Sequence, residues 1–296
     1  MKNPLKALFW KITVSPLAPV LRIIHGALAH TVIFILDTLW NLRYGKPSAE
    51  EVEQVRTKVT FMYKSFERQK LAVRLFNSIQ KYYPGVRVVI ADDSAKPLEI
   101  DSEFVTIIHL PFNSGVSRGL NCALEQVRTP FLVKVEDDMI LCARTDVARQ
   151  LSWLESHPEV DLTAFAHLDV LWKASAKRAM KTYYDQPMAF APKPQIIPHM
   201  TRLDAGHIVV AKPANVFLAR TESIRKIGWD DNIRMIDHAE FFYRAAGILV
   251  STISTDTVIF HNHNPYNRHY NKYRGDWQGD AQYIRMKRQS YPIRRI

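Results

Sequence analysis

Short apolar runs alternate with segments of helical spacing between residues 59 and 135. The segment 67–82 repeats its apolar side chains every three to four positions and stops before Pro84 and Gly85. This order of elements predicts a parallel sheet with helices on both faces. The predicted strands are 59–63, 86–91, 105–110 and 131–135, and the predicted helices are 67–82 and 117–127.

Three of the predicted strands are followed directly by polar clusters. In open α/β sheets, ligands bind outside the carboxyl ends of the strands. Three polar strand ends therefore predict a binding site at that edge of the sheet. The clusters are Lys64-Ser65, Asp92-Asp93-Ser94 and Glu136-Asp137-Asp138.

The first part of the chain, residues 5–41, is rich in large apolar side chains that charged residues and prolines interrupt. Its longest uncharged run, 23–36, is shorter than the ~20 apolar residues that span a bilayer. We therefore expect one or two amphipathic helices lying in a membrane interface. The alternatives are a helical hairpin packed on the protein, an oligomer contact, or a signal anchor. Residues 46–56 are polar and indicate a linker.

The formal net charge of +11, from 40 Lys and Arg against 29 Asp and Glu, indicates an anionic partner. Zinc-finger, helix-turn-helix and aromatic-interleaved basic patterns are missing from the sequence, so we expect no nucleic-acid partner. Lipid headgroups and a sugar diphosphate remain as candidate anionic partners.

Two cysteines, Cys122 and Cys142, cannot form a disulfide framework and are expected to be buried. This usage is typical of a reducing compartment.

The sequence lacks the glycine motifs that hold phosphates, because it has neither a Gly-x-Gly-x-x-Gly turn nor a Gly-Lys-Ser/Thr loop. A divalent metal is another means of neutralising a diphosphate. Carboxylates at a strand end, such as Asp137 and Asp138, are hard ligands that suit Mg²⁺ or Mn²⁺. Acidic residues are also common in ordinary turns after strands, so the triplet alone does not establish a metal site.

Several short motifs give most of residues 57–290 a family resemblance. The chain resembles family 2 glycosyltransferases of the GT-A fold, and more narrowly the ganglioside-synthesising β-1,4-N-acetylgalactosaminyltransferases. The resemblance implies a Rossmann-like α/β fold with a mostly parallel central sheet flanked by helices, preceded here by an amphipathic helical extension. The matching motifs lie at 64–68, 82–84, 88–97, 110–115, 118–121, 136–138, 143–145, 215–221 and 238–242.

The resemblance also assigns residues to a UDP-sugar site. Asp92 and Asp93 would contact the uracil and ribose, and Arg118 and Asn121 would line the nucleotide pocket. The other expected donor-binding residues come from the first strand end, the acidic triplet and the basic tail. They are Lys64, Phe66, Arg68, Glu136, Asp137, Lys272 and Arg274. The tail that matches the family at 270–274 would fold over the diphosphate, adding positive charge and excluding water.

A divalent metal, Mn²⁺ or Mg²⁺, would bind the diphosphate in this family. Asp138 would ligate it directly, with Asp137 beside it. A further ligand in this fold usually comes from a C-terminal strand end. His261 follows such a predicted strand, and His263 is the reserve candidate.

Single displacement with inversion needs a general base for the acceptor hydroxyl. The family places a carboxylate in the segment that begins at Asp237, where this chain has His238 in the position of a usual Asp. Glu240 is the first choice for the base, His238 the second and Asp237 the third. The alternative is that Asp237 only caps a helix and His238 forms a pocket wall.

The acceptor is expected to bind within residues 160–235, where Trp172, Tyr183, Tyr184 and Trp229 are candidate stacking platforms, although aromatic residues are more often core. Asp204, His207 and Lys212 are further candidates for lining it.

The chain is expected to divide into an N-terminal extension, 1–50, and a catalytic domain, 51–296, with a nucleotide-sugar half, 51–145, and an acceptor half, 146–296. We expect a metal-dependent inverting glycosyltransferase that moves an N-acetylhexosamine from a UDP-sugar to a glycan or glycolipid. The alternatives are a sugar-phosphate nucleotidyltransferase and a non-catalytic membrane-surface scaffold. The expected location is the cytoplasmic face of a membrane, and the alternative is a signal anchor in a secretory-pathway membrane.

Overall fold

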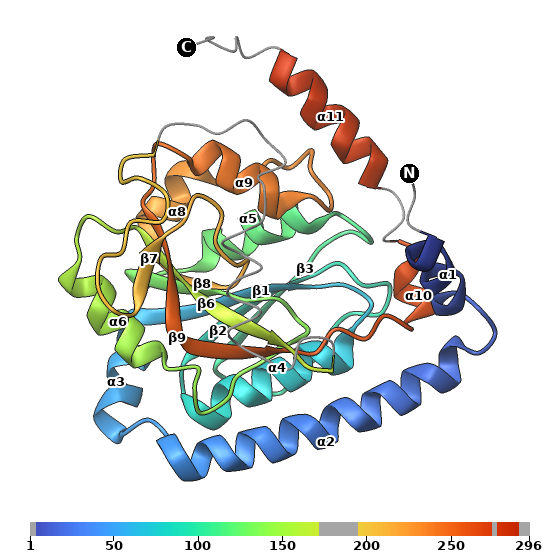
Figure 1. The fold of residues 1–296 in the computed structure, drawn as a ribbon, viewed down its shortest axis with the longest axis horizontal. Helices are drawn as coiled ribbons and strands as arrows, with labels where there is room; N and C mark the ends of the chain where they lie inside the picture. Colours follow the sequence, from blue (N-terminus) through green and yellow to red (C-terminus); the bar gives the residue numbers. More distant parts are fainter. Residues whose placement is uncertain (1–3, 172–194, 274–276, 290–296) are drawn as a thin grey trace.

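The computed structural model describes residues 4–171, 195–273 and 277–289 as an α/β fold around one central sheet (Figure 1). Four parallel strands form the first half of the sheet, in the order β3-β2-β1-β4. Each coincides with a predicted strand to within two residues. β1, β2 and β4 are apolar runs that become buried, whereas β3, at the edge of the sheet, is only partly buried. They are β1 Val59–Ser65, β2 Arg87–Asp92, β3 Val105–His109 and β4 Phe131–Lys134.

The second half of the sheet continues from β4 with mixed pairing. β8 (Phe217–Arg220) is antiparallel to β4 and to β6 (Leu162–Asp169), and β6 is parallel to β9 (Ser251–His261). β5 (Met139–Ile140) and β7 (His207–Val209) are both antiparallel to β9. The pairing of Met139 with His261 brings the end of β9 beside the residues that follow β4.

The register between β6 and β9 is interrupted once. Ala164 lies opposite Ile253, but Ala166 lies opposite Val258. From there the pairing runs without a break to the last residues of both strands, where Asp169 lies opposite His261.

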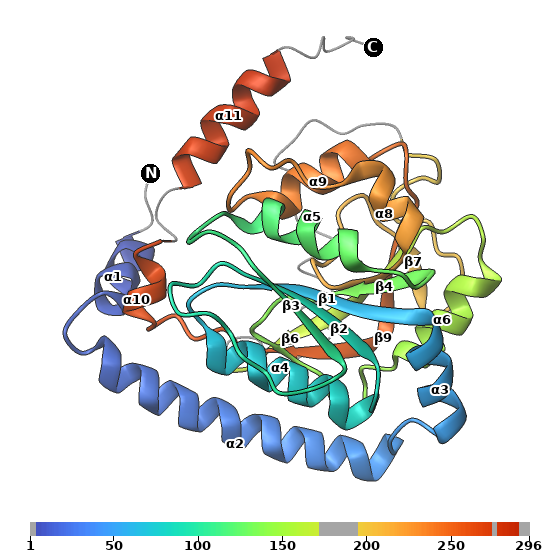
Figure 2. The ribbon, with the colours of Figure 1, turned by 180° about the vertical axis from the view of Figure 1, so that it is seen from behind.

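The helices cover both faces of the sheet, as predicted (Figures 1 and 2). α4 (Gln69–Tyr82) covers one face and buries Leu75, Phe76 and Ile79 in the core. The opposite face carries α5 (Val116–Gln126), α8 (Thr221–Ile227) and α9 (Asp237–Ala245). The remaining helices of this part are α6 (Val147–Ser156), α10 (Arg268–Asn271) and α11 (Trp277–Gln289).

Two helices, α1 (Pro4–Thr13) and α2 (Ala18–Tyr44), form the N-terminal extension. α2 has 27 residues and is long and apolar enough to cross a membrane, with 11% of its most apolar stretch buried. The uncharged run 23–36 covers only part of this helix, which continues past Arg22 and Asp37. One side of α2 packs on the domain, where Trp40 stacks on Phe260 at 5.1 Å between ring centroids.

The polar segment 46–56, expected to be a linker, is largely helical. α3 (Ala49–Lys58) begins at a capping box in which Ser48 accepts from the Glu51 amide and Glu51 accepts from the Ser48 amide. The sequence pattern Ser-x-x-Glu that indicates such a start was present at 48–51. Of the two cysteines, Cys142 is buried as expected, whereas Cys122 is partly exposed.

Candidate active site

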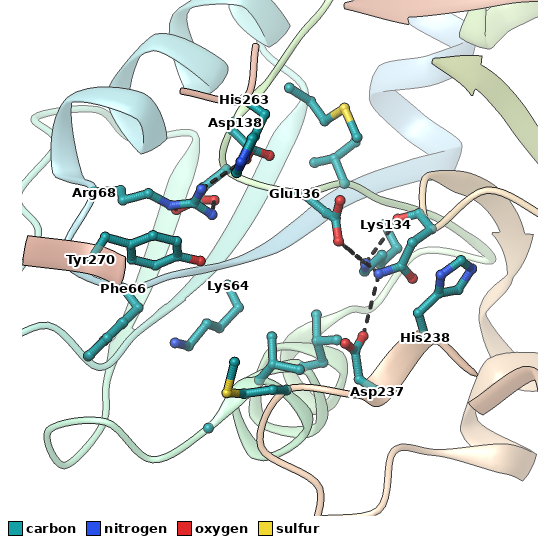
Figure 3. Close-up of a pocket in the computed structure, with 18 of the residues that line it drawn as sticks. Lys64, Phe66, Arg68, Lys134, Glu136, Asp138, Asp237, His238, His263 and Tyr270 are labelled. Atoms are coloured by element: carbon teal, nitrogen blue, oxygen red, sulfur yellow. Dashed lines mark hydrogen bonds and ion pairs between the residues drawn. The ribbon is translucent and has the colours of Figure 1, made fainter. Parts of the chain in front are cut away.

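A pocket of about 470 Å³ opens at the carboxyl ends of β1 and β4, where the polar strand ends predicted a site. Figure 3 shows two groups of side chains facing each other across it, with Lys64 between them. One group contains Arg68, Asp138 and His263, and the other contains Glu136, Asp237 and His238. A pocket of this size can hold a small molecule such as a nucleotide sugar.

Arg68 occupies the centre of the first group. Its guanidinium donates to Asp138 Oδ2 at 2.8 Å and binds both carboxylate oxygens of Asp137, and it lies 4.1 Å from the centre of the Tyr270 ring. Burial raises the pKa of Asp137 to about 6, although the Arg68 charge opposes this rise. Burial acts in the same direction on Asp138, but Arg68 and His261 outweigh it and hold the pKa of Asp138 well below its usual range.

Asp138, His261 and His263 form a cluster that could hold a metal ion, with one ligand atom of each within 4.8 Å of the others. His261 Nε2 lies 3.6 Å from Asp138 Oδ1, and His263 Nδ1 lies 3.7 Å from Asp138 Oδ2. Burial would lower the pKa of His261, but Asp138 and Asp169 raise it to about 10. A metal would therefore have to displace a proton from His261, which is the usual behaviour of histidine ligands.

This donor set fits a divalent cation. It combines one carboxylate with two imidazoles, and the pocket beside it leaves room for phosphate oxygens and water. Mg²⁺ prefers oxygen ligands, whereas nitrogen ligands suit softer divalent ions. The two imidazoles therefore set this cluster apart from an all-oxygen Mg²⁺ site.

The second group is built around Asp237, the first residue of α9, which is buried. Asn215 donates from Nδ2 to Glu136 Oε1 at 2.8 Å and lies 3.5 Å from Asp237 Oδ2. Burial raises the pKa of Asp237, and the nearby Lys134 ammonium only partly opposes this. Asp237 is thus a carboxylate on the pocket wall with an increased proton affinity, which is a property of general bases.

His238 also lines the pocket but is held as a neutral ring. Its Nε2 lies 2.8 Å from the carbonyl oxygen of Pro213, which can only accept, so Nε2 must carry the proton. Burial lowers the pKa of His238 to about 3. His238 is therefore a neutral pocket wall at physiological pH, as the alternative interpretation of the sequence allowed.

Glu240 has a different environment, and the described pocket wall does not include it. Its carboxylate accepts from Arg244 at 2.7 and 2.9 Å and from Lys287 of α11 at 3.1 Å. Only 3% of the residue is exposed. The first turn of α9 points Asp237 and His238 into the pocket, and Glu240 ties α9 to α11 instead.

Asp92 and Asp93, expected to contact the uracil and ribose, are both buried and are missing from the described pocket lining. Asp92 accepts from Ser94 Oγ at 2.7 Å and from the Leu98 amide at 2.8 Å. Asp93 pairs with Lys64 at 2.5 Å and accepts from the Gly115 amide at 3.2 Å. Asp93 thus acts on the pocket through Lys64, which lines it.

The neighbouring helix α5 leaves space for this lysine. A Cβ atom on Gly119 would lie 2.7 Å from Lys64 Cγ, so a larger residue at this position would displace Lys64. Arg118 is exposed, and Asn121 is used to hold the main chain of Trp229 at 2.8 Å. The described pocket lining contains neither Arg118 nor Asn121.

The remaining expected residues divide into three cases. Lys272 is exposed and is not among the described lining residues, whereas Tyr270 and Tyr273 from the same tail line the pocket.

Among the candidates for acceptor binding, Trp229 is in the core and stacks on Phe241 at 5.0 Å between ring centroids. His207 stacks on Trp153 at 3.6 Å. Asp204 bonds to both members of this second stack, and Lys212 is partly buried. The expected residues Trp172, Tyr183, Tyr184 and Arg274 lie outside the described residues.

The pocket also contains residues to which no role was assigned from the sequence. Asn215 begins one of the motifs of the resemblance, so a signal for it existed. Tyr273 was included only as part of the tail 270–274; its ring packs edge-on against Phe66 at 5.2 Å and against Phe112 at 5.7 Å, a contact that the fold creates. The other such lining residues include Asn113, Lys134, His167, Arg234 and Met235.

Comparison with known proteins agrees with the sequence motifs. Residues 62–208 match the family "Glycosyl transferase family 2". The chain is 33% identical over 213 residues to human beta-1,4 N-acetylgalactosaminyltransferase 1, which covers 69% of this chain. The chain spans 38% of the length of that relative.

Solved structures share the fold. TarS 1-349 of S. aureus in complex with UDP-GlcNAc aligns with a TM-score of 0.52 and 15% identity, over 70% of this chain and 58% of that one. The mannosyltransferase PcManGT from Pyrobaculum calidifontis in complex with GDP-Man and Mn²⁺ aligns with a TM-score of 0.52 and 16% identity, over 90% and 76% of the two chains. These matches confirm the predicted α/β fold as that of GT-A glycosyltransferases.

Proposed function

Because this chain contains a glycosyltransferase family 2 domain, we propose that it transfers a sugar from a UDP-sugar to a glycan or glycolipid acceptor, with inversion and with a divalent metal. One observation carries the proposal. The cluster of Asp138, His261 and His263 lines the same pocket as Lys64 and Arg68, at the carboxyl ends of parallel strands. Metal ligands and cations on one wall are what a sugar diphosphate requires.

The metal, which we propose to be Mn²⁺, would be held by Asp138, His261 and His263, and when bound it would neutralise charge on the departing diphosphate. Lys64 supplies a further positive charge, and Arg68 is placed to add its own. Both cations are already fixed by buried carboxylates, so they need little reorganisation during the reaction. Tyr270 and Tyr273 cover this side of the pocket and would reduce access of water, which competes with the acceptor.

On the opposite wall, Asp237 would take the proton from the acceptor hydroxyl. Asn215 and Lys134 lie beside it, and Lys134 Nζ donates to the Asn215 carbonyl at 2.9 Å. Asp237 replaces Glu240 as the first candidate for the base because the Glu240 carboxylate is committed to Arg244.

We propose an N-acetylhexosamine as the donor sugar. The human relative is named for N-acetylgalactosaminyl transfer, and the S. aureus neighbour was solved with UDP-GlcNAc. The acceptor hydroxyl would lie at Asp237, and the far end of the acceptor would extend past His261 and His263, where a second cavity of about 480 Å³ is lined by Phe9 of α1 and Pro265. An apolar residue of the N-terminal extension beside the metal cluster is consistent with an acceptor that carries a lipid.

A thermal-shift screen tests the donor and metal together. UDP-GalNAc, UDP-GlcNAc and GDP-mannose would each be added with Mn²⁺, with Mg²⁺ and with a chelator. We expect the largest rise in Tm from a UDP-N-acetylhexosamine with Mn²⁺, because a ligand that binds only the folded state at about 100 times its Kd stabilises it by about 2.7 kcal/mol. If no UDP-sugar raised the Tm with either metal, the proposal would fail.

We further propose that α2 makes peripheral contact with a membrane. Its outer side exposes several large apolar residues, and Ile23, Phe34 and Leu42 are 73%, 72% and 81% exposed. The other side of α2 is bonded to the domain through Asp37, which accepts from Lys81 and Tyr82. Since α2 is fixed along the domain in this way, the arrangement favours a helix that lies on the membrane surface.

Vesicle flotation with the full chain tests this contact. Phe34→Glu with Leu42→Glu is expected to reduce the bound fraction at least several-fold, because each change removes apolar area and adds repulsion from anionic lipid. Ile248→Glu, at a residue 55% exposed outside α2, is the control and should float like the wild type. Equal flotation of all variants would contradict the proposal. Protease protection of sealed membranes then separates a cytoplasmic-face protein from a signal-anchored one.

A further inference from the structure

The end of β6 lies against the metal cluster. Asp169, the last residue of β6, is opposite His261, the last residue of β9, in the parallel ladder. Asp169 Oδ1 is 2.5 Å from His261 Nδ1, and both side chains are about four-fifths buried, with 19% and 20% exposed. Because the acceptor is a carboxylate, this is a charge-assisted hydrogen bond.

The His261 ring therefore lies between two carboxylates. Its Nδ1 faces Asp169, and its Nε2 faces Asp138 at 3.6 Å. A carboxylate can only accept, so Nδ1 must carry the proton as long as it bonds to Asp169. The nitrogen left to bind a metal is then Nε2, which already faces the other proposed ligand.

We propose that Asp169 is a positioning residue that fixes the orientation of His261, with Nε2 toward Asp138, and so sets the affinity of the site for the metal. The inference rests on the metal site of the proposed function. Carboxylate partners of metal-bound histidines fix the ring and its tautomer, and their loss typically lowers metal affinity about 10- to 100-fold.

A second arrangement uses the same residues differently. His167, Asp169 and His261 also bring ligand atoms within 4.8 Å of one another, so Asp169 could itself be a ligand. The distances favour the positioning role. Asp169 Oδ1 is 2.5 Å from His261 Nδ1 but 3.6 Å from His167 Nε2, so the oxygen is engaged in the bond to His261.

The experiment is a Mn²⁺ titration of the full chain without nucleotide. Calorimetry measures the affinity for Mn²⁺, and pulsed EPR measures the ¹⁴N coupling to the bound ion. Asp169→Ala should weaken Mn²⁺ binding about 10- to 100-fold and reduce the ¹⁴N coupling. Asp169→Asn keeps a carbonyl acceptor for Nδ1–H and should restore part of the affinity. His167→Ala, which alters the neighbouring ring but leaves the Asp169–His261 bond, should bind Mn²⁺ within about threefold of the wild type.

Two outcomes would overturn the inference. One is wild-type Mn²⁺ affinity in Asp169→Ala with a normal Tm. The other is an equal loss in His167→Ala and Asp169→Ala, which would make both residues ligands. The failure of the proposed function has a different signature, since in that case no UDP-sugar binds while the effect of Asp169→Ala on Mn²⁺ persists. If Asp169→Ala lowers the Tm strongly, its Mn²⁺ affinity is not used, and Asp169→Asn is compared with His167→Ala instead. The inference holds if Asp169→Asn binds Mn²⁺ more weakly than His167→Ala, and it fails if the two variants bind Mn²⁺ equally well.

Discussion

Replacement of Asp138 by alanine is expected to abolish metal-dependent binding of the UDP-sugar and to lower kcat/KM by roughly 10³-fold or more. The reason is that a bound divalent ion contributes several kcal/mol of charge stabilisation, and each 1.36 kcal/mol is tenfold in rate. The fold should survive, because Arg68 keeps its pair with Asp137 when Asp138 is removed. The measurements are the Mn²⁺-dependent shift in Tm and turnover of the UDP-sugar.

The matched control for this change is Asp256→Ala. Asp256 also pairs with an arginine, Arg149, at 2.8 Å, but the pair is exposed on the surface. Exposed pairs of this kind contribute about 0–1 kcal/mol, so stability and turnover should both stay close to the wild type. Turnover retained in Asp138→Ala would refute the assignment of Asp138 as a metal ligand.

Replacement of Asp237 by asparagine is expected to lower kcat about 10²- to 10⁴-fold, which is the usual contribution of a general base. Binding of the UDP-sugar should change little, because asparagine preserves the shape of the side chain. In the wild type, turnover should increase as the pH rises through the pKa of Asp237, since only the carboxylate can take a proton. Burial raises that pKa, so this limb should lie above the pH at which an exposed aspartate ionises.

Glu240→Gln is the control that separates the two candidate bases. Glutamine leaves Arg244 and Lys287 without their shared negative partner, so the Tm should fall. The rate of the folded enzyme should stay within about tenfold of the wild type, an effect well below that of a lost general base. If Glu240→Gln were inactive and Asp237→Asn active, the base would be Glu240, as first expected from the sequence.

The parts of the fold that sequence reasoning predicted are those with a one-dimensional signal. β1 to β4 are apolar runs between turn residues, and α4 has an apolar stripe, so their positions follow from periodicity. α4 starts at Gln69 rather than at the predicted residue 67, because Glu67 has a positive φ of 53°. Backbone conformations of this kind have no clear signature outside glycine.

The site was predicted less completely, for a different reason. The polar strand ends identified the edge of the sheet at which the pocket lies, but they could not tell which side chains turn into it. Asp92 and Asp93 turn inward to bind Ser94 and Lys64. Glu240 is bonded to Arg244 and to Lys287, and Lys287 belongs to a helix 47 positions further along the chain. Such choices depend on three-dimensional neighbours that a single sequence does not specify.

The interrupted register between β6 and β9 has a consequence for insertions and deletions. Uninterrupted pairing from Ala164 and Ile253 would put Val258 opposite Asp169 and would carry His261 three residues past the end of β6. The number of residues in the 254–257 segment thus decides which side chain meets Asp169. Because strand faces alternate, the loss of one residue there would turn the opposite face of β9 toward Asp169. This stretch lies outside the described pocket lining, but its length sets the residue that faces Asp169, so it should tolerate substitutions far better than changes in length.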